Sequence, residues 1–496
     1  MEQTVSSQST FKLNYKRTFL IGFAFFGILL LWQVYDLWCP TFLSEMFAKA
    51  FYPEYEALRQ INTEEAIKQC GEIIKKVQYP VGIMMAIDNI AALILMPVFG
   101  HLSDKTNTKI GKRMPYILIG TFVCAVAFPF IPVLFHFNQL AGVIIMMAVV
   151  VLFAMMYRNP AVALMPDITP KPLRSKANGI INIMGYIGGA FATVVGLVFV
   201  LSRYLGTTTD KVTHLYAEHT WAYNNIWAVE GPFLVASVLM LVSAVVLFIF
   251  VKENKIKEEM KDELARGEAV SETADKVDDD KPLSKANKIM LFLILGAEFF
   301  WFMADNGIST FLNNYVIYGT HSESTSTMIL TILGGVGSVA GFAVGGIIAS
   351  KIGRKWTLFG GLGLSLLSYF VWALLTFTAG LPNGSIPIWL YIIWLVKGFG
   401  MSLVHVNSFP MVVELCNSKK IGRFTGYYYA ASMSAQTITP IALGGLLFIP
   451  AFDWRFLPVY AGVCIAISLV VFFFVKNVKS TKTTFKKGLE ALDAED

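Results

Sequence analysis

The sequence predicts an all-α polytopic membrane protein with twelve transmembrane helices arranged as two pseudo-symmetric six-helix halves. The prediction rests on the composition, on the number of long apolar segments and on a repeat between the two halves of the chain. Of the 496 residues, 55% are hydrophobic and only 15% are charged, and the mean hydropathy is +0.59. A soluble globular protein is about 25% charged. This chain therefore has too little polar surface for a globule in water.

The apolar segments have the length of membrane-spanning helices. A helix needs about 20 mostly apolar residues to cross the hydrocarbon core. Twelve segments meet this condition. We expect the helices at residues 17–42, 80–103, 114–135, 139–159, 175–203, 229–252, 288–315, 326–350, 356–380, 387–412, 424–449 and 455–475.

The distribution of Lys and Arg predicts the orientation of these helices. If the N-terminus lies inside, the short inner segments and the tail carry 21 Lys and Arg, and the outer segments carry 8. Five of those 8 lie in one longer loop, where the positive-inside bias is weak. We therefore expect a multi-pass protein of the plasma or inner membrane, surrounded by lipid, with both termini in the cytoplasm.

Two longer connections divide the chain. In residues 43–79, Thr63 precedes an amphipathic pattern that predicts a capped helix on the outer side. Residues 253–287 are dense in charges of both signs, which predicts a cytoplasmic linker. The expected domains are an N-terminal half at 1–252, this linker, a C-terminal half at 288–475 and a cytoplasmic tail at 476–496.

A repeat relates the two halves. Gly100-His-Leu-Ser-Asp104 with Ile110-Gly-Lys-Arg113 follows the second apolar segment, and Gly346-Ile-Ile-Ala-Ser350 with Ile352-Gly-Arg-Lys355 follows the eighth. Asp167 and Arg174 after the fourth segment are echoed by Glu414 and Arg423 after the tenth. Transporters built from repeated halves place the substrate site between them, near the middle of the membrane.

Several function classes find no support in the sequence. It contains no phosphate-binding loop, no metal-ligand cluster and no GxSxG motif, so we expect neither an enzyme nor a cofactor or metal. The excess of Lys and Arg lies between apolar segments, so topology explains it better than a nucleic-acid partner. The five cysteines have no CxxC spacing, and Cys39 and Cys70 are either free thiols or an outer disulfide. A monomer is expected, and no cleavable signal peptide is visible.

The loop motifs resemble those of a known family. Gly100-x-x-x-Asp104-Lys105 followed by Gly111-Lys112-Arg113 resembles the loop signature of the major facilitator superfamily. The longer run from Gly100 to Tyr116 is similar to the glycoside–pentoside–hexuronide:cation symporter branch. The run Arg158-Asn-Pro-Ala-Val-Ala-Leu-Met-Pro-Asp167, with Arg174 and Asn178-Gly179, resembles the sucrose/proton symporter-like members. This resemblance implies import of a di- or oligosaccharide by symport with a cation through alternating access.

One departure from that family concerns the cation. Melibiose-type members carry two aspartates just before the Pro-x-x-Gly that ends the second span, and use them for sodium. Here Ala92-Leu-Ile-Leu-Met96 precedes Pro97-Val-Phe-Gly100, and Asp88 lies a full turn earlier. We therefore expect protons rather than sodium ions.

Ionisable residues inside the apolar segments are candidates for substrate binding and coupling. A charge at the bilayer centre costs about 2.5–3.5 kcal/mol on insertion scales, so such residues pair, line a cavity or act in transport. Lys397 is a candidate partner for Asp305 or Glu298, whereas His405 is best explained as a packing residue. Asp36 and Asp88 alternatively reach interfacial water, and Arg158 alternatively snorkels. The candidates are Asp36, Asp88, Arg158, Glu298, Asp305 and Lys397.

Aromatic and amide side chains accompany these charges. Sugars are bound by hydrogen bonds to their hydroxyls and by flat apolar faces against their C–H surfaces. The same rings also suit a membrane interface, and both interpretations stay open. The candidates for stacking and hydrogen bonding are Trp32, Gln33, Tyr35, Trp301 and Asn306.

The loop motifs are candidate gates. Gly100 permits close helix approach, and Asp104 has the charge to pair with an arginine or a helix N-terminus. The alternative is that the basic residues only anchor the topology. The gating candidates are Gly100, Asp104, Gly111, Lys112, Arg113, Asp167, Arg174, Glu414 and Arg423.

Other functions of the same fold remain open from the sequence. A proton-coupled exporter of small solutes would use the same buried charges. A non-transporting membrane sensor or a lipid flippase would keep the fold without the coupling carboxylates or the solute selectivity.

The predicted topology is testable by labelling single cysteines introduced at positions 60, 270 and 490 of a cysteine-free protein. We expect an impermeant maleimide added to sealed cells to label position 60 only. Labelling of position 270 or 490 from outside would contradict the orientation.

Overall fold

The computed structural model describes residues 12–210, 213–216, 227–267, 285–413, 415 and 421–476. Within these residues, twelve helices are long and apolar enough to cross a membrane. The all-α fold class and the count of twelve spans are confirmed. Residues 268–284 of the predicted linker and the tail from 477 lie outside the described residues.

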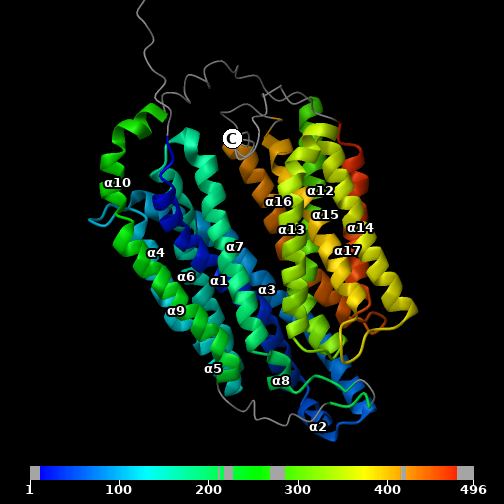
Figure 1. Ribbon diagram of the computed structural model, residues 1–496. Coiled ribbons are helices and arrows are strands. Elements are labelled where there is room, and N and C mark those ends of the chain that lie inside the picture. Colours follow the sequence, from blue (N-terminus) through cyan, green and yellow to red (C-terminus); the bar gives the residue numbers. More distant parts are fainter. Residues whose placement is uncertain are drawn as a thin grey trace, which may run out of the picture.

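The helices form two groups that lie side by side (Figure 1). Most observed spans match the predicted segments, but three of them are broken. The third predicted segment comprises α4 and α5, the fifth α7 and α8, and the seventh ends in a π-helical turn, η2. The N-terminal group contains α1 (Tyr15–Phe51), α2 (Glu54–Ile61), α3 (Glu64–Lys105), α4 (Met114–Ala127), α5 (Phe130–His136), α6 (Leu140–Asp167), η1 (Lys171–Leu173), α7 (Arg174–Val198), α8 (Leu201–Leu205), α9 (Trp227–Phe250) and α10 (Glu253–Glu259). The C-terminal group contains α12 (Lys285–Asn314), η2 (Tyr315–Gly319), α13 (Thr325–Ile352), α14 (Arg354–Thr378), α15 (Ile388–Val413), α16 (Ile421–Phe448) and α17 (Phe456–Phe473).

The outer loop predicted at 43–79 is part of a helical hairpin. We use this name for the last part of α1, α2 and the first part of α3. The amphipathic helix expected after Thr63 is not separate, because α3 runs without a break from Glu64 to Lys105 through Pro80. Thr63 caps it by accepting a hydrogen bond from the Ala66 N–H at 3.3 Å. We call this end of the molecule the hairpin end, and the end with loop 106–113 and α10 the linker end (Figure 1).

A buried ion pair holds the hairpin together. The Glu45 side chain is 1% exposed, and one of its oxygens lies 3.0 Å from the Arg59 guanidinium. The other oxygen accepts hydrogen bonds from Tyr55 at 3.1 Å and from Tyr318 of η2 at 2.8 Å. Burial lowers the pKa of Arg59, but the Glu45 carboxylate and the neighbouring tyrosines together outweigh burial and hold this pKa above its ordinary value. Through Tyr318, this ion pair also reaches the C-terminal group.

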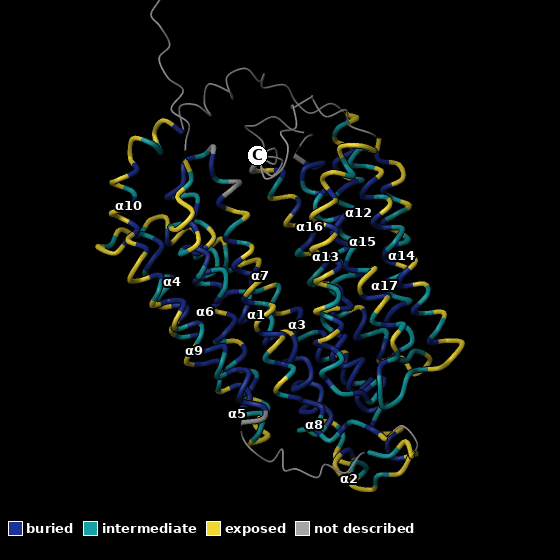
Figure 2. The backbone as a smooth tube through the Cα atoms, viewed as in Figure 1, coloured by how far each residue is buried: buried dark blue, intermediate teal, exposed yellow. Residues whose placement is uncertain are grey.

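Polar side chains join the two groups at the hairpin end. The Asn314 amide donates to Ser44 Oγ and to Gln78 Oε1, both at 2.9 Å, and accepts from Thr41 Oγ1 at 2.7 Å. The neighbouring Asn313 donates to the Leu37 carbonyl at 2.8 Å. These groups are buried (Figure 2), so each bond replaces one that water would have made. Toward the linker end the ribbons of the two groups diverge (Figure 1).

The repeated loop motifs share a glycine with positive φ in both halves. Gly111 has a φ of +123° and Gly353 a φ of +90°, a region that favours glycine. Each glycine precedes a helix, α4 or α14. This correspondence agrees with the sequence repeat. Cys39 and Cys70, for which the sequence left a disulfide open, are buried free thiols, whereas Cys416 lies outside the described residues.

Loss of the buried ion pair should destabilise the hairpin end. Arg59→Met leaves the Glu45 carboxylate buried with only hydroxyl partners, and breaking a buried pair costs about 3–5 kcal/mol. We expect a lower thermal unfolding midpoint for the purified protein. The matched control is Lys49→Met, because Lys49 lies 3.1 Å from Glu56 in an exposed pair worth about 0–1 kcal/mol. Equal midpoints for the two variants would contradict the role of the pair.

Candidate functional site

A cavity of about 230 Å³ lies between the two groups of helices, at mid-depth along them. Five helices contribute to it: α1, α3 and α6 from the N-terminal group, and α12 and α16 from the C-terminal group. This is the position at which transporters of repeated halves bind substrate. The lining residues are Leu29, Trp32, Tyr35, Asp36, Met85, Asp88, Asn89, Ala92, Met155, Arg158, Asn306, Ser309, Thr310 and Gln436.

The charged groups of the cavity all come from the N-terminal half. Asp36 of α1 lies exposed to the cavity, and Arg158 of α6 attracts its carboxylate electrostatically. The third charged residue, Asp88 of α3, accepts a hydrogen bond of 2.6 Å from the Tyr35 hydroxyl. Asp88 is therefore held by a partner, whereas Asp36 is available to a solute or a proton.

The C-terminal half supplies uncharged polar groups. Asn306, Ser309 and Thr310 follow one another along α12, and their spacing of three and four residues places them on one face. Gln436 of α16 also lines the cavity, and its backbone carbonyl accepts a hydrogen bond of 3.1 Å from Asn89 of α3. The cavity thus combines carboxylates and a guanidinium on one wall with amides and hydroxyls on the other.

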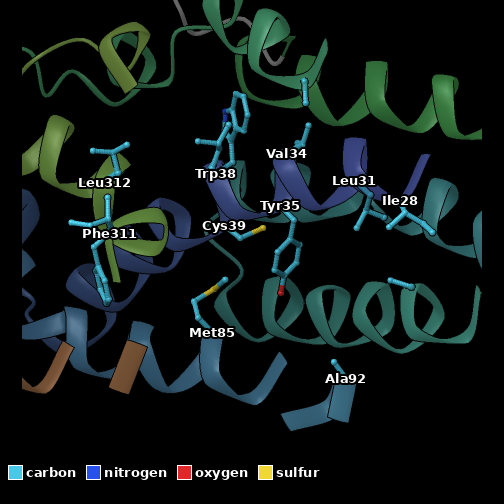
Figure 3. Close-up of a cluster of buried hydrophobic side chains, with 14 of the residues drawn as sticks. Ile28, Leu31, Val34, Tyr35, Trp38, Cys39, Met85, Ala92, Phe311 and Leu312 are labelled. Atoms are coloured by element: carbon cyan, nitrogen blue, oxygen red, sulfur yellow. The ribbon is translucent and has the colours of Figure 1, made fainter. Parts of the chain in front are cut away.

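Two aromatic rings of α1 border the charged wall. Trp32 and Tyr35 pack edge to face with ring centroids 5.6 Å apart. Figure 3 shows Tyr35 and Cys39 on the side of α1 that faces Met85, whereas Val34 and Trp38 point the other way. The side chain of Tyr35 is fully buried, and its hydroxyl donates a hydrogen bond to Asp88. Trp32, which is partly buried, is the aromatic face that the cavity offers to a ligand.

Six of the predicted substrate residues line this cavity and five do not. Trp32, Tyr35, Asp36, Asp88, Arg158 and Asn306 line it. Gln33 faces α7, since its amide oxygen lies 3.9 Å from the position a Cβ would take on Gly189. The other four, Trp301, Glu298, Asp305 and Lys397, lie within the C-terminal half.

Asp305 and Lys397 form an ion pair inside the C-terminal half. The Lys397 ammonium of α15 donates to Asp305 Oδ1 of α12 at 2.5 Å. Their side chains are 35% and 14% exposed. His405, eight residues after Lys397, packs its ring 5.5 Å from Phe302, in agreement with a packing role. Each charge of the pair thus has a partner, and neither residue is among those that line the cavity.

Glu298 and Trp301 are buried without hydrogen-bond partners among the described residues. Both carboxylate oxygens of Glu298 and the indole nitrogen of Trp301 lack a partner, and neither side chain is exposed. A carboxyl group in such a dry position is tolerated as the neutral acid, since an isolated charge there would be strongly disfavoured.

The gating candidates of the N-terminal half gather around Arg113 at the linker end. The Arg113 guanidinium contacts Asp104, lies 2.9 Å from Asp167 and lies 2.5 Å from Ser103 Oγ. Lys112 adds a contact of 3.2 Å to Asp167. Gly100 lets α6 approach, because a side chain there would overlap Asn159. The cluster thus ties α3, the 106–113 loop and α6 together within one half.

Glu253, which the sequence analysis did not single out, completes this cluster from α10. Its buried carboxylate accepts hydrogen bonds from the backbone N–H groups of Lys112, Arg113 and Met114 at 3.0–3.2 Å. These are orphan donors at the start of α4, which has no capping side chain of its own. A side chain on Gly111 would overlap Glu253. A sequence search for charges inside spans misses such a residue, because Glu253 looks like one more linker charge.

The remaining gating candidates have local partners or lie outside the described residues. Arg174 donates to the Thr169 carbonyl at 3.2 Å, and Arg423 to the Tyr427 hydroxyl at 2.6 Å. Glu414 lies outside the described residues. The polar cavity residues that were not predicted from the sequence are uncharged: Asn89, Ser309, Thr310 and Gln436. Ser309 and Thr310 had a signal in the sequence, because they are polar residues three and four positions after the predicted Asn306, whereas Gln436 has no predicted cavity residue on its helix.

Solved structures of transporters share this fold at low sequence identity. A bacterial homologue of the iron transporter ferroportin, in an inward-facing state, has a TM-score of 0.60 and 13% identity, over 93% of this chain and 99% of that one. The xylose transporter XylE from E. coli, in an inward-open conformation, has a TM-score of 0.59 and 14% identity, over 97% of this chain and 98% of that one. A POT family transporter in complex with 5-aminolevulinic acid has a TM-score of 0.57 and 14% identity, over 94% of this chain and 96% of that one. At this identity the likeness shows the fold alone.

The sequence itself identifies the family. No curated protein matches it significantly. The family model described as Major Facilitator Superfamily matches residues 41–382 and, a second time, residues 294–492. The first match covers more than half of the chain. Together with the twelve spans, the two related halves and the cavity between them, it shows that this chain belongs to the major facilitator superfamily.

Proposed function

We propose that the protein is a secondary active transporter that imports a sugar or glycoside by symport with protons. The observation that supports this most directly is the cavity between the halves, with carboxylates and a guanidinium on one wall and amides and hydroxyls on the other. Alternating access needs a site that both halves share, because only then does their relative movement change the side from which the solute is reached.

The donors and acceptors of the cavity suit a polyhydroxylated solute. Asp36 and Arg158 offer charge-assisted hydrogen bonds to hydroxyls, and Asn306 and Gln436 offer both donors and acceptors. Trp32 offers a flat apolar face. The volume of about 230 Å³ lies below the range of roughly 300–1,000 Å³ of drug-sized ligand pockets. It favours a mono- or disaccharide within the glycoside class.

The linker end is proposed to face the cytoplasm, with the molecule open toward that side. The positive-inside distribution of Lys and Arg supports this orientation. At the hairpin end, Asn314, Tyr318 and Glu323 reach across to the N-terminal half. At the linker end, Arg113 and Glu253 bind partners within their own half. The hairpin end therefore acts as the closed outer gate in this conformation.

Asp36 is the proposed proton carrier. Of the six coupling candidates from the sequence, Glu298, Asp305 and Lys397 do not line the cavity. A symporter must load proton and solute from the same side, so the carrier has to share the solute's compartment. Asp36 meets that condition, and Arg158 is near enough to stabilise its ionised form once the proton leaves. Asp88, held by Tyr35, then helps to bind the solute.

Protons are favoured over sodium by the residues around Asp88. After Asn89 the chain is apolar from Ile90 to Met96, and within the described residues no three carboxylates, histidines or cysteines gather to hold a metal ion. Membership of the glycoside–pentoside–hexuronide:cation symporter branch, near its sucrose/proton symporters, rests on the motifs from Gly100 to Tyr116 and from Arg158 to Asp167.

Proteoliposomes test this function directly. Purified protein is reconstituted and offered labelled mono- and disaccharides, with and without a pH gradient that is acidic outside. We expect one sugar to accumulate only with the gradient. An exporter would accumulate solute under the opposite gradient, and uptake of no sugar under any gradient would overturn the proposal.

Asp36→Asn separates coupling from transport. Because the amide cannot carry a proton but keeps similar shape, we expect counterflow of the sugar to persist and accumulation under a pH gradient to fall at least tenfold. The control is Asp262→Asn, an exposed residue at the linker end, which should accumulate like the wild type. Accumulation by Asp36→Asn at the wild-type level would place the proton elsewhere.

Variants of the Asp305–Lys397 ion pair test whether the two residues act together. Lys397→Met leaves the Asp305 carboxylate without its lysine partner, and we expect the free energy of unfolding to fall by up to about 3 kcal/mol. This value is the low end of the range for fully buried pairs, because both side chains here are partly exposed. The double variant Asp305→Asn/Lys397→Met removes both charges and should lie closer to the wild type in unfolding midpoint and downhill uptake. A double variant as impaired as Lys397→Met would show that the two residues act separately.

A further inference from the structure

A second pocket, of about 390 Å³, lies at the linker end, outside the transport cavity. It is formed by the 106–113 loop, the last turn of α9 and α10. One side is cationic and the other apolar. The lining residues are Lys109, Ile110, Met114, Phe248, Val251, Lys252, Glu253, Asn254, Lys255 and Glu258.

The cationic side carries more positive charge than its acids neutralise. Glu253 is already committed to three backbone N–H groups and to Lys257, which lies 2.6 Å away. Lys255 has only an exposed contact of 3.8 Å to Glu259. Lys109 has no ion pair within the part of the chain that the structure describes. Three lysines therefore face the pocket against one further acid, Glu258.

The apolar side continues into the lipid-facing surface of the molecule. Phe248, Ile249 and Phe250, at the end of α9, are 46%, 50% and 59% exposed. In a membrane-spanning helix, exposed apolar residues of this kind face acyl chains. Lys252 follows directly, and its ammonium folds back to lie 4.8 Å from the centre of the Phe248 ring. The pocket thus sits where α9 leaves the hydrocarbon, at the level of lipid headgroups.

The loop that forms the pocket is held in place by α10. Asn254 donates to the carbonyls of Thr108 and Lys109 at 2.9 and 3.1 Å. Glu253 holds the next residues through their N–H groups. The backbone of Lys109 is therefore fixed relative to α10, which keeps Lys109 at the same pocket as Lys252 and Lys255.

We propose that this pocket binds the headgroup of an anionic phospholipid, its phosphate between Lys109, Lys252 and Lys255 and an acyl chain along Phe248. A phosphodiester matches the cationic side, and only a lipid also uses the apolar side. A soluble phosphate would gain nothing from Ile110 or Phe248. Because the lipid contacts the loop that contains Arg113, its binding stabilises the linker end of the N-terminal half.

The test uses the full protein in detergent, titrated with short-chain phosphatidylglycerol, short-chain phosphatidylcholine or glycerol 3-phosphate. The readouts are the thermal unfolding midpoint and the number of bound lipids by native mass spectrometry. Of these three compounds, we expect only phosphatidylglycerol to raise the unfolding midpoint. Each lysine removed should weaken its binding about fivefold at low salt.

The variant Lys109→Gln/Lys252→Gln/Lys255→Gln should lose this response. The control Lys285→Gln/Lys288→Gln/Lys351→Gln removes the same charge from exposed positions at the same end and should keep it. If the triple variant does not fold, Lys109→Gln alone, which disturbs no ion pair within the described residues, replaces it. An unchanged response in the pocket variant, an equal response to phosphatidylcholine, or an equal response to glycerol 3-phosphate would each overturn the proposal.

Discussion

The fold depends on the rule that a polar group removed from water needs a partner. At the hairpin end this rule is met across the boundary between the halves, where Asn314 binds Ser44, Gln78 and Thr41. At the linker end it is met within one half, where Arg113 and Glu253 bind their neighbours. The hydrogen bonds between the two halves thus run from the hairpin end to the cavity, where Asn89 binds the Gln436 carbonyl. A change of conformation has to exchange the first set of bonds for another or for water.

The sequence predicted the features that depend on local composition. Twelve apolar segments became twelve spans, because a bilayer admits only segments of that length and polarity. The repeat of Ile110-Gly-Lys-Arg and Ile352-Gly-Arg-Lys corresponded to a repeat in backbone geometry at Gly111 and Gly353. The hairpin was only half predicted. Hydropathy detects where a segment becomes polar, but α3 continues through that change, because Pro80 does not interrupt it.

The site was harder to predict, since it depends on which face of each helix meets the other half. Asp36 and Asp305 look alike in sequence, each a carboxylate within an apolar segment. In the structure one lines the cavity and the other binds Lys397. No periodicity of a single helix distinguishes them, because the difference lies in the neighbouring helix. Glu253 was missed for the same reason: its partners are backbone groups more than 130 residues away in the chain.

The lengths of α1 and α3 have a mechanical consequence. At 1.5 Å per residue, their 37 and 42 residues span about 55 and 63 Å, well beyond a hydrocarbon core of about 30 Å. Both helices are continuous from the cavity residues Asp36 and Asp88 into the hairpin. When the N-terminal half rotates as a rigid body, the hairpin therefore moves further than the cavity residues near the middle of α1 and α3. Rocking the N-terminal half about the opposite end would displace the hairpin by about 1 Å per degree. A spectroscopic probe on α2 would report small rotations of the transport site as large movements outside the membrane.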